Sequence, residues 1–423
     1  MFADDIVLLS ESAEGLQNSL NKLNIYCKKW KLTLNTDKTK VIIFNRGGHQ
    51  IKKFRFTYNS NEIQITQKYC YLGILFTSSG LFTEAIKSLS EKASKAFYML
   101  RKLNTRDNTK LTLKLFDSLV SPILHYSCEV WAPFLFKKFK NDNFLSICDT
   151  APIENLNIKL CKYILGVGKK STNLAVKGEL GRSPLLIKAT QLSVKFWHRL
   201  NILDTNTFVK KSYLDDIIMN HKNYSGWSHC IYNIMNNFGM GDIWENQADP
   251  DLTANHFFTH QMYNLYKEQW LKAVKYSSKL KNYAKFKVDF NIENYLLFMP
   301  TKSRRNFTKF RISNHNLSIE TGRYTNPKTP PEHRMCLFCL NNCVEDEFHF
   351  LLNCPFYTVE RESLLDKLKF LDINDFECEE SFVSLMSSTD YDVCTILCKY
   401  VQDCYEKKKL IYCQRRRLLQ NFT

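Results

Sequence analysis

The amino-acid sequence predicts an α+β segment at the N-terminus, followed by a longer, mainly α-helical region that ends in a small Cys/His knuckle and a helical tail. Three observations support this fold class. Strand-like runs flank one helical pattern up to about residue 78, apolar residues then recur at steps of three and four, and a cluster of cysteines and a histidine begins at Cys336. The segments that we expect are 1–78, 79–200, 201–330, 331–362 and 363–423.

The N-terminal segment is predicted to form strand, helix and strand in that order. Residues 2–10 are an apolar run with two adjacent acids, while 41–44 and 69–76 are β-branched and aromatic. One face of an amphipathic helix lies between the first two runs, outlined by Leu16, Leu20, Leu23, Cys27 and Trp30.

Beyond residue 81 the apolar pattern becomes helical. The first stripe is formed by Leu89, Ala93, Ala96, Phe97 and Leu100. A second stripe is formed by Leu111, Leu115 and Leu119, and we expect Pro122 to end that helix because proline cannot continue a helix interior. The region from about 130 to 330 is predicted to be mostly helical.

Composition and charge limit the class of protein. The chain has 423 residues, of which 44% are hydrophobic and 24% are charged, so it can bury a core and is not disordered throughout. Its net charge of +17 favours a polyanionic partner, either nucleic acid or an acidic membrane surface. No apolar run approaches the length of a spanning helix, and the mean hydropathy is −0.33, so we expect no membrane association.

The cysteines indicate the compartment. There are 15 of them, an odd number scattered over a large chain, which is typical of reduced thiols and not of a disulfide framework. We therefore expect an intracellular protein of the nucleus or cytoplasm whose partner is nucleic acid.

Asp4 and Asp5 adjoin the first apolar run. Two acids beside a strand most often lie in a solvent-exposed turn, and the alternative is a Mg²⁺ site for phosphoryl transfer. Further motifs follow in order, namely Gly15-Leu-Gln17, Tyr26-Cys27, Leu34-Asn35, Lys38-Thr-Lys40, Tyr71-Leu-Gly-Ile74, Leu119–Leu124, Glu129-Val-Trp131, Gly178–Pro184, Phe310–Ser313 and Ile319–Arg323.

Together with Phe2-Ala-Asp-Asp5, these ordered motifs resemble the reverse transcriptases of non-LTR (LINE-type) retrotransposons. The resemblance implies an RNA-directed DNA polymerase, a nucleotidyltransferase whose palm ends in segment 1–78 and whose thumb is the helical segment 79–200. It further implies that Asp4 and Asp5 bind Mg²⁺ and that Lys38 or Lys40 donates a proton to pyrophosphate. The pair at 72–73 resembles the hairpin that grips the primer.

The same resemblance implies that one catalytic carboxylate lies upstream of Asp4, where this chain has three residues. We therefore expect a C-terminal fragment of a reverse transcriptase of target-primed reverse transcription, inactive alone, with an RNA template and a DNA target or primer as partners. The alternative is a non-catalytic nucleic-acid-binding protein with a zinc knuckle.

The Cys/His cluster has the spacing Cys336-x₂-Cys339-x₉-His349-x₄-Cys354. Three thiolates and one imidazole at these intervals predict a closed tetrahedral Zn²⁺ site, and the alternative is a set of buried structural cysteines. Cys343 lies inside the loop and could compete for the metal. Because so short a segment has little core of its own, we expect its fold to depend on the ion.

Residues 267–334 carry fifteen Lys/Arg and five Asp/Glu, interleaved with aromatic residues. This pattern favours a surface where cations neutralise phosphates and aromatic rings stack on unpaired bases, although a solvated helix face is the ordinary alternative. The nucleic-acid-binding candidates are Lys302, Arg304, Arg305, Lys309, Arg311 and Arg323.

Three weaker motifs are set aside. The loop 166–170 lacks the first glycine and the Ser/Thr of a phosphate-binding loop, and the histidines at 256 and 260 lack the glutamate of a catalytic zinc helix. Cys394, Cys398 and Cys404 have no histidine nearby and are predicted to be core thiols.

Overall fold

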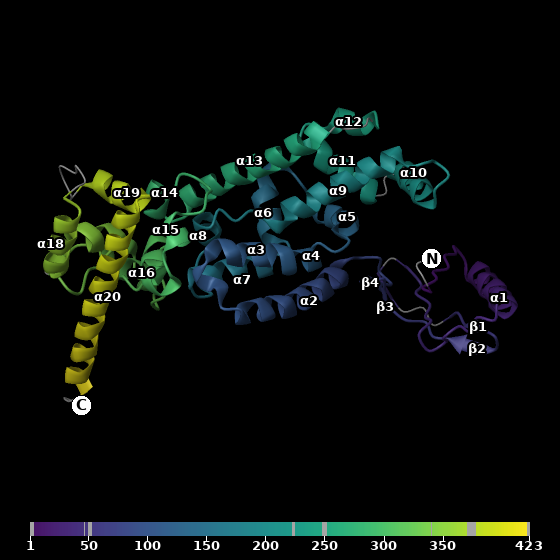
Figure 1. Ribbon diagram of the computed structural model, residues 1–423, viewed down its shortest axis with the longest axis horizontal. Helices are drawn as coiled ribbons and strands as arrows, with labels where there is room; N and C mark the ends of the chain where they lie inside the picture. Colours follow the sequence, from purple (N-terminus) through teal and green to yellow (C-terminus); the bar gives the residue numbers. More distant parts are fainter. Residues whose placement is uncertain are drawn as a thin grey trace. The chain divides into compact units, whose positions relative to one another are not determined.

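The computed structural model describes residues 4–45, 47–49, 53–221, 225–247, 252–339, 341–369 and 378–420, with the side chains of 220–221, 252–254 and 415–420 left out (Figure 1). Contacts divide the chain into two compact units, residues 1–92 and residues 93–423. We call the second unit the helical body. The finer boundaries at residues 200, 330 and 362 stay predictions.

The first unit combines one helix with two small antiparallel hairpins. Its elements are α1 (Ala13–Lys29), β1 (Phe56–Tyr58), β2 (Asn61–Ile63), β3 (Lys68–Tyr71), β4 (Ile74–Thr77) and the start of α2 (Thr83–Lys102). In the first hairpin Phe56 pairs with Ile63, and in the second Lys68 pairs with Thr77. Leu72 and Gly73 turn the second hairpin with positive φ angles, which suits a two-residue connection.

Helix α1 covers the first hairpin. Ser12 begins the helix by accepting a hydrogen bond from the amide of Gly15. The side-chain amide of Gln17 donates a hydrogen bond to the carbonyl of Thr57 and accepts one from its N–H, at 2.9 Å each. These two bonds satisfy the backbone donor and acceptor of Thr57 at the edge of the hairpin. The buried side chains beneath the helix are Leu20, Val41, Phe56, Tyr58 and Ile63.

The strand predictions for this unit are partly wrong. Residues 6–10 form no strand, and residues 2–3 lie outside the described residues. The 41–44 run makes one parallel bridge, between Val41 and Ile65, and the hairpin at 56–63 was not foreseen. An extended run becomes a strand only when a partner strand pairs with it. Local β propensity does not show which partner is available, so it does not predict this pairing.

The helical body is built from helices of very different lengths. They are α3 (Thr109–Leu119), α4 (Ser121–Leu124), α5 (Cys128–Trp131), α6 (Phe144–Thr150), α7 (Glu154–Leu165), α8 (Asn173–Glu179), α9 (Leu185–Ile202), α10 (Phe208–His221), α11 (Trp227–Asn237), α12 (Gly241–Glu245), α13 (Leu252–Tyr276), α14 (Tyr283–Phe286), α15 (Tyr295–Phe298), α16 (Thr301–Arg311), α17 (Ser318–Thr321), α18 (Thr358–Lys367), α19 (Glu379–Ser387) and α20 (Tyr391–Gln420).

Short 3₁₀ turns and one π turn connect these helices. They are η1 (Thr105–Asp107), η2 (Ala132–Phe136), η3 (Asn141–Asn143), η4 (Pro331–His333), the π turn η5 (His349–Asn353) and η6 (Pro355–Tyr357). Helix α9 packs on α5 and α13, while α20 packs on α16 and α18 (Figure 1). None of the helices in the described ranges is long and apolar enough to cross a membrane.

The helical stripes were predicted with mixed success. The α2 stripe is confirmed, with Leu89, Ala93, Phe97 and Leu100 all buried. Helix α3 ends at Leu119, just before the Pro122 turn, as expected, but it buries a neighbouring face of the helix. Leu111 and Leu119 are exposed, and Thr112 and Phe116 are completely buried instead. A leucine repeat marks a helix correctly without showing which face the rest of the chain covers.

A buried ionic network ties several helices together. The guanidinium of Arg311 donates to the carboxylate of Glu179 at 3.2 Å and to that of Glu293 at 2.7 Å. It also donates to the carbonyl of Met386, and the Tyr295 hydroxyl donates to Glu179 at 2.7 Å. Burial alone would lower the pKa of Arg311, but the two carboxylates raise it, so its charge is retained in the core.

A second network lies in the core near α6, α7 and α8. The ammonium of Lys177 is completely buried, 2.7 Å from Asp149 and 3.3 Å from Glu154. The guanidinium of Arg182 forms a bidentate ion pair with the carboxylate of Asp117, with N···O distances of 2.5 and 2.9 Å. In both networks, carboxylates from other segments of the chain balance the charge of the buried cations.

Two glycines of the 178–184 motif permit close packing. A Cβ atom on Gly178 would lie 2.3 Å from the ring of Trp270. Gly181 has a φ of +54° and passes so close to the backbone of Ile292 that a Cβ atom would lie 2.7 Å from its nitrogen. This motif therefore belongs to the core of the helical body.

Replacing Arg311 by glutamine should destabilise the body strongly. The substitution leaves Glu179 and Glu293 buried without their cation, and breaking a buried ion pair in this way costs about 3–5 kcal/mol. Urea unfolding monitored by circular dichroism measures the loss. The matched control is Lys302→Gln on the exposed face of the same helix, which should change stability by at most about 0.5 kcal/mol. Equal stability of the two variants would contradict the prediction.

Candidate metal centre

A short hairpin presents the first two cysteines of the cluster. Met335 and Val344 form an antiparallel bridge, and the amide of Cys336 donates to the carbonyl of Cys343 at 2.8 Å. The loop between them carries Cys339. The x₂ spacing therefore places both thiols at the same end of the hairpin.

The other two ligands lie at the two ends of the π turn η5. The amide of Cys354 donates to the carbonyl of His349 at 2.7 Å, which is the i→i+5 bond of a π turn. In an α-helix, residues five apart point in different directions at 100° per residue. The wider turn brings His349 and Cys354 toward the same side, and such turns are frequent at functional sites.

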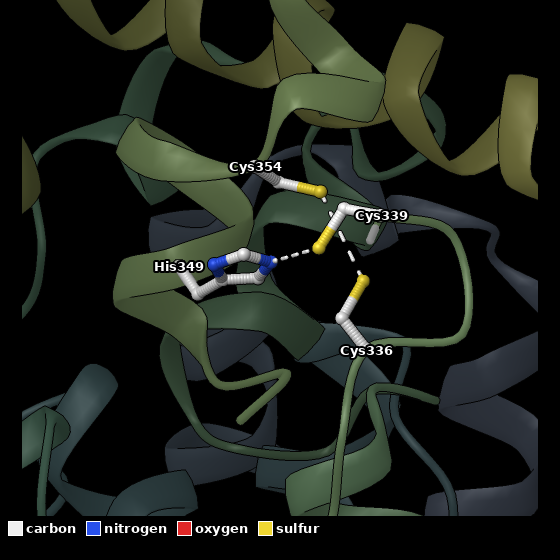
Figure 2. A group of neighbouring side chains, drawn as sticks. All are labelled: Cys336, Cys339, His349 and Cys354. Atoms are coloured by element: carbon white, nitrogen blue, oxygen red, sulfur yellow. Dashed lines mark hydrogen bonds between the residues drawn. The ribbon is translucent and has the colours of Figure 1, made fainter. Parts of the chain in front are cut away.

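The four side chains converge on one point (Figure 2). All ligand atoms lie within 4.8 Å of one another, with 3.9 Å between the sulfurs of Cys336 and Cys354 and 3.4 Å between the Cys339 sulfur and His349 Nε2. A tetrahedral Zn²⁺ with Zn–S bonds of about 2.3 Å separates two sulfurs by about 3.8 Å. The cluster is consistent with a zinc site.

The close approach of two thiols also favours a bound cation. The Cys336 and Cys354 sulfurs share a hydrogen bond, which lowers the pKa of Cys336 to about 3 and raises the pKa of Cys354. Two thiolates this close repel each other, so a doubly charged ion between them is what would allow both to ionise. Zn²⁺ would then be held by Cys336, Cys339, His349 and Cys354 as a structural ion with no open position.

Cys343 lies apart from the cluster. Its side chain is exposed and its sulfur donates to the carbonyl of Asn341 at 3.2 Å. It does not belong to the group of ligand atoms that lie within 4.8 Å of one another.

Buried acids anchor the knuckle to the helical body. Glu345 accepts a hydrogen bond from the ammonium of Lys408 on α20 and, at 2.7 Å, from the amide of Ser318 on α17. Glu347 accepts from His315 at 2.8 Å and from Ser313 at 2.7 Å. Burial would raise the pKa of Glu347, but the nearby His315 and these hydrogen bonds lower it to about 2, so it stays ionised.

Apolar contacts join the π turn to the same body. Phe350 is completely buried and stacks near Phe310 of α16 and Tyr405 of α20, with ring centroids 5.3 Å away in each case. The hydroxyl of Tyr400 donates to the carbonyl of Leu351 at 2.9 Å. The knuckle thus packs into the core of the body, so apolar contacts to α16 and α20 hold it in addition to the four clustered side chains.

The predicted polymerase residues lie in the first unit. Asp4 and Asp5 are both exposed, Lys38 is exposed in a turn, and Lys40 is half-buried. The Asn35 side chain accepts a hydrogen bond from the Lys38 amide at 3.0 Å, which stabilises the turn. Among the described residues, the groups of three or more possible metal ligands do not include Asp4 or Asp5. Their Mg²⁺ role stays a prediction.

Two of the predicted nucleic-acid contacts are buried. Arg304 donates to the carbonyls of Leu296 and Met299, at 2.7 and 2.6 Å, and is completely inaccessible. Arg311 is the cation that faces Glu179 in the buried network. We therefore assign both to the core, in correction of the sequence-based expectation. Helical periodicity could have distinguished these two buried arginines from the exposed cations of α16, since positions 301, 304, 308 and 311 form one stripe of the helix.

The remaining candidates stay accessible. Lys302 and Arg305 are exposed and Lys309 is half-buried, all on the opposite side of α16. Arg323 is half-buried and its Nε lies 3.0 Å from Glu320. These four residues remain candidates for phosphate contacts.

Most of the aromatic residues of this stretch cannot stack on bases. The buried ones are Tyr266, Trp270, Tyr283, Phe286, Phe307 and Phe310. Tyr276 and Tyr324 are exposed. The interleaving of basic and aromatic residues therefore reflects an amphipathic core pattern.

The motifs set aside behave as expected where the structure describes them. Cys394, Cys398 and Cys404 are buried, and burial raises the pKa of each thiol. His256 and His260 are exposed on α13, at the rim of an open hollow of about 630 Å³.

Comparison with known proteins gives one relationship. The chain is 30% identical over 133 residues to an uncharacterized transposon-derived protein of Caenorhabditis elegans. The chain is a distant partial homologue of a transposon-derived protein. The match covers 31% of this chain and 47% of that relative, so the chain spans about half of the relative's length. No protein-family model and no solved structure matches the chain.

The centre should bind about one Zn²⁺ per chain through four protein ligands. Cys354→Ser should abolish this binding, because serine replaces a thiolate by a neutral hydroxyl, whereas Cys343→Ser should leave it unchanged. Elemental analysis of the purified full-length variants measures the zinc content. The same zinc content in both variants would contradict the assignment of the four ligands.

Removing the metal should loosen the knuckle without unfolding the body. Since Phe350 and Glu345 attach it to α16 and α20, chelation should increase hydrogen exchange in 334–354 while the helical circular dichroism falls only slightly. Hydrogen-exchange mass spectrometry with and without chelator tests this. A cooperative loss of all helical signal would show that the whole body depends on zinc.

Proposed function

We propose that the chain is the C-terminal portion of a non-LTR retrotransposon reverse transcriptase, and that its helical body binds RNA or DNA. The Cys336–Cys354 cluster is the observation on which this proposal mainly rests, because it builds a closed structural metal site into a strongly basic helical body. The partial homology to a transposon-derived protein and the ordered motifs support the retroelement origin.

Nucleic-acid binding is the first candidate because the Cys/His cluster and the accessible cations both belong to the helical body. Two-metal phosphoryl transfer needs carboxylates that clamp both the attacking and the leaving oxygen. Within the described residues, no third acid joins Asp4 and Asp5 in a group of possible ligands. Polymerase activity is the second candidate, supported by the ordered motifs, with Asp4 and Asp5 as Mg²⁺ ligands and Lys38 or Lys40 as the proton donor.

The accessible cations determine the kind of binding that we propose. Lys302, Arg305 and Lys309 lie on one face of α16, while the aromatic residues around them are buried. Contacts to phosphates carry no sequence information, and base stacking needs exposed rings. We therefore propose electrostatic binding with little sequence preference.

The full-length chain with bound zinc should bind oligonucleotides with an affinity that decreases steeply with salt. Each phosphate contact releases counterions, with a slope of about 0.9 per contact for duplex DNA and about 0.7 for single strands. Fluorescence anisotropy at several salt concentrations, with RNA and DNA of two unrelated sequences, measures the slope and the preference. Absence of binding at low salt, or a flat salt dependence, would contradict the proposal.

A primer-extension assay on the same preparation tests the second candidate. Incorporation of dNTPs that disappears in Asp4→Ala would establish polymerase activity, and the exposed Asp37→Ala is a control of the same chemistry in the same unit. Unchanged incorporation in both variants would point to a contaminating polymerase.

A further inference from the structure

Arg101 and Arg106 lie over the ring of Tyr163 in the helical body, and Arg305 contacts the loop that follows α7. The guanidinium carbons of Arg101, at the end of α2, and Arg106, in η1, lie 5.1 and 5.4 Å from the centroid of the Tyr163 ring. Arg305 of α16 donates to the carbonyl of Gly166, just after α7, at 3.0 Å. Lys309 lies one helical turn beyond Arg305. We call Arg101, Arg106, Arg305 and Lys309 the Tyr163 cluster.

The members of the cluster are close enough to repel one another. Burial and then the charges of Arg305 and Arg101 lower the pKa of Arg106, and burial and the charge of Arg305 lower the pKa of Lys309. A side-chain nitrogen of Arg106 lies against Gly166, whose carbonyl binds Arg305, so the two guanidiniums share one small area of the loop. Like charges held together in this way favour an anion between them.

Among the described residues, no carboxylate forms a salt bridge with this cluster. The completely buried Lys177 and the buried Arg311 each face two carboxylates. In contrast, the salt bridges between described residues include none of the four cluster cations. The neighbouring Asp107 attracts Arg106 but uses one oxygen to accept the amide of Thr301 at 2.8 Å.

One nitrogen of Arg106 points to a missing acceptor. Its Nε is buried and has no hydrogen-bond partner among the described residues. The ring of Tyr163 packs edge-to-face against Phe97, with centroids 6.2 Å apart. This contact fixes the ring over which the two arginines lie. Arg101 and Arg106 lie over this ring, so the site presents guanidinium groups, which suit phosphate oxygens better than they suit a stacked base.

We propose that the Tyr163 cluster binds phosphate groups of a nucleic-acid backbone. This inference rests on the proposed function and locates it on a surface where Arg101 and Arg106 join the α16 residues. Guanidinium groups with fixed positions recognise phosphate through paired N–H donors and lose little entropy on binding. The cluster would position the backbone and would not distinguish bases.

The test compares two double variants of the full-length chain. The first is Arg305→Gln with Lys309→Gln on α16. The matched control is Lys195→Gln with Arg199→Gln on α9, where both side chains are exposed, have the same spacing and remove the same two charges. Glutamine keeps the helix propensity of all four positions. Circular dichroism and zinc content confirm that each variant is folded.

The cluster variant should bind duplex DNA at least about tenfold more weakly than wild type, with a salt slope reduced by about 1.8 for two lost phosphate contacts. The control should retain nearly the wild-type slope. Arg101→Gln, which changes an exposed member from a different helix, should reduce the slope by about 0.9 and keeps the test independent of α16. Inorganic polyphosphate should compete for the site.

Each outcome separates the two proposals. If the wild-type chain binds no oligonucleotide, the proposed function fails and the cluster assignment fails with it. If the wild type binds and the cluster and control variants weaken equally, nucleic-acid binding stands and the Tyr163 cluster is overturned. Binding of vesicles with acidic phospholipids that requires the cluster, without oligonucleotide binding, would overturn the choice of nucleic acid.

Discussion

The helical body depends on the placement of Arg311 between two buried carboxylates. Glu179 ends α8, Glu293 precedes α15, and the guanidinium comes from the last turn of α16, so one cation joins three segments that are distant in the sequence. Removing the guanidinium alone would leave two desolvated acids, which is far costlier than losing a surface ion pair. Because α20 and the knuckle pack on α16, the positions of both depend on this arrangement.

The sequence predicted helices better than it predicted their surroundings. Helical periodicity located α1, α2 and α3, since a repeat of apolar residues is a local property. It assigned the wrong buried face to α3, where Thr112 and Phe116 face the core and Leu111 faces solvent. Which face is covered depends on chain segments far away, as does the pairing of short strands such as Phe56–Tyr58.

The four residues of the Cys/His cluster could be predicted because their spacing is a local property of the sequence. Cys336, Cys339, His349 and Cys354 lie together as expected, since an x₂ pair and a turn of five residues need no distant partner. The basic residues were harder to predict, because charge alone does not show whether an arginine is exposed. Arg304 is buried against carbonyl oxygens, whereas Arg305, one residue later, faces outward.

The π turn at the Cys/His cluster links the number of residues between His349 and Cys354 to the winding of the backbone. A π turn is an α-helical turn widened by one residue, and it is seldom retained without a function. Deleting a single residue between His349 and Cys354 would let the segment relax into an ordinary α-helical turn. In that turn the two residues would be i, i+4 neighbours, which lie on the same face of an α-helix. A natural sequence with an interval one residue shorter could therefore keep both side chains on one side with an ordinary helical turn, and the π turn is how this chain accommodates the additional residue.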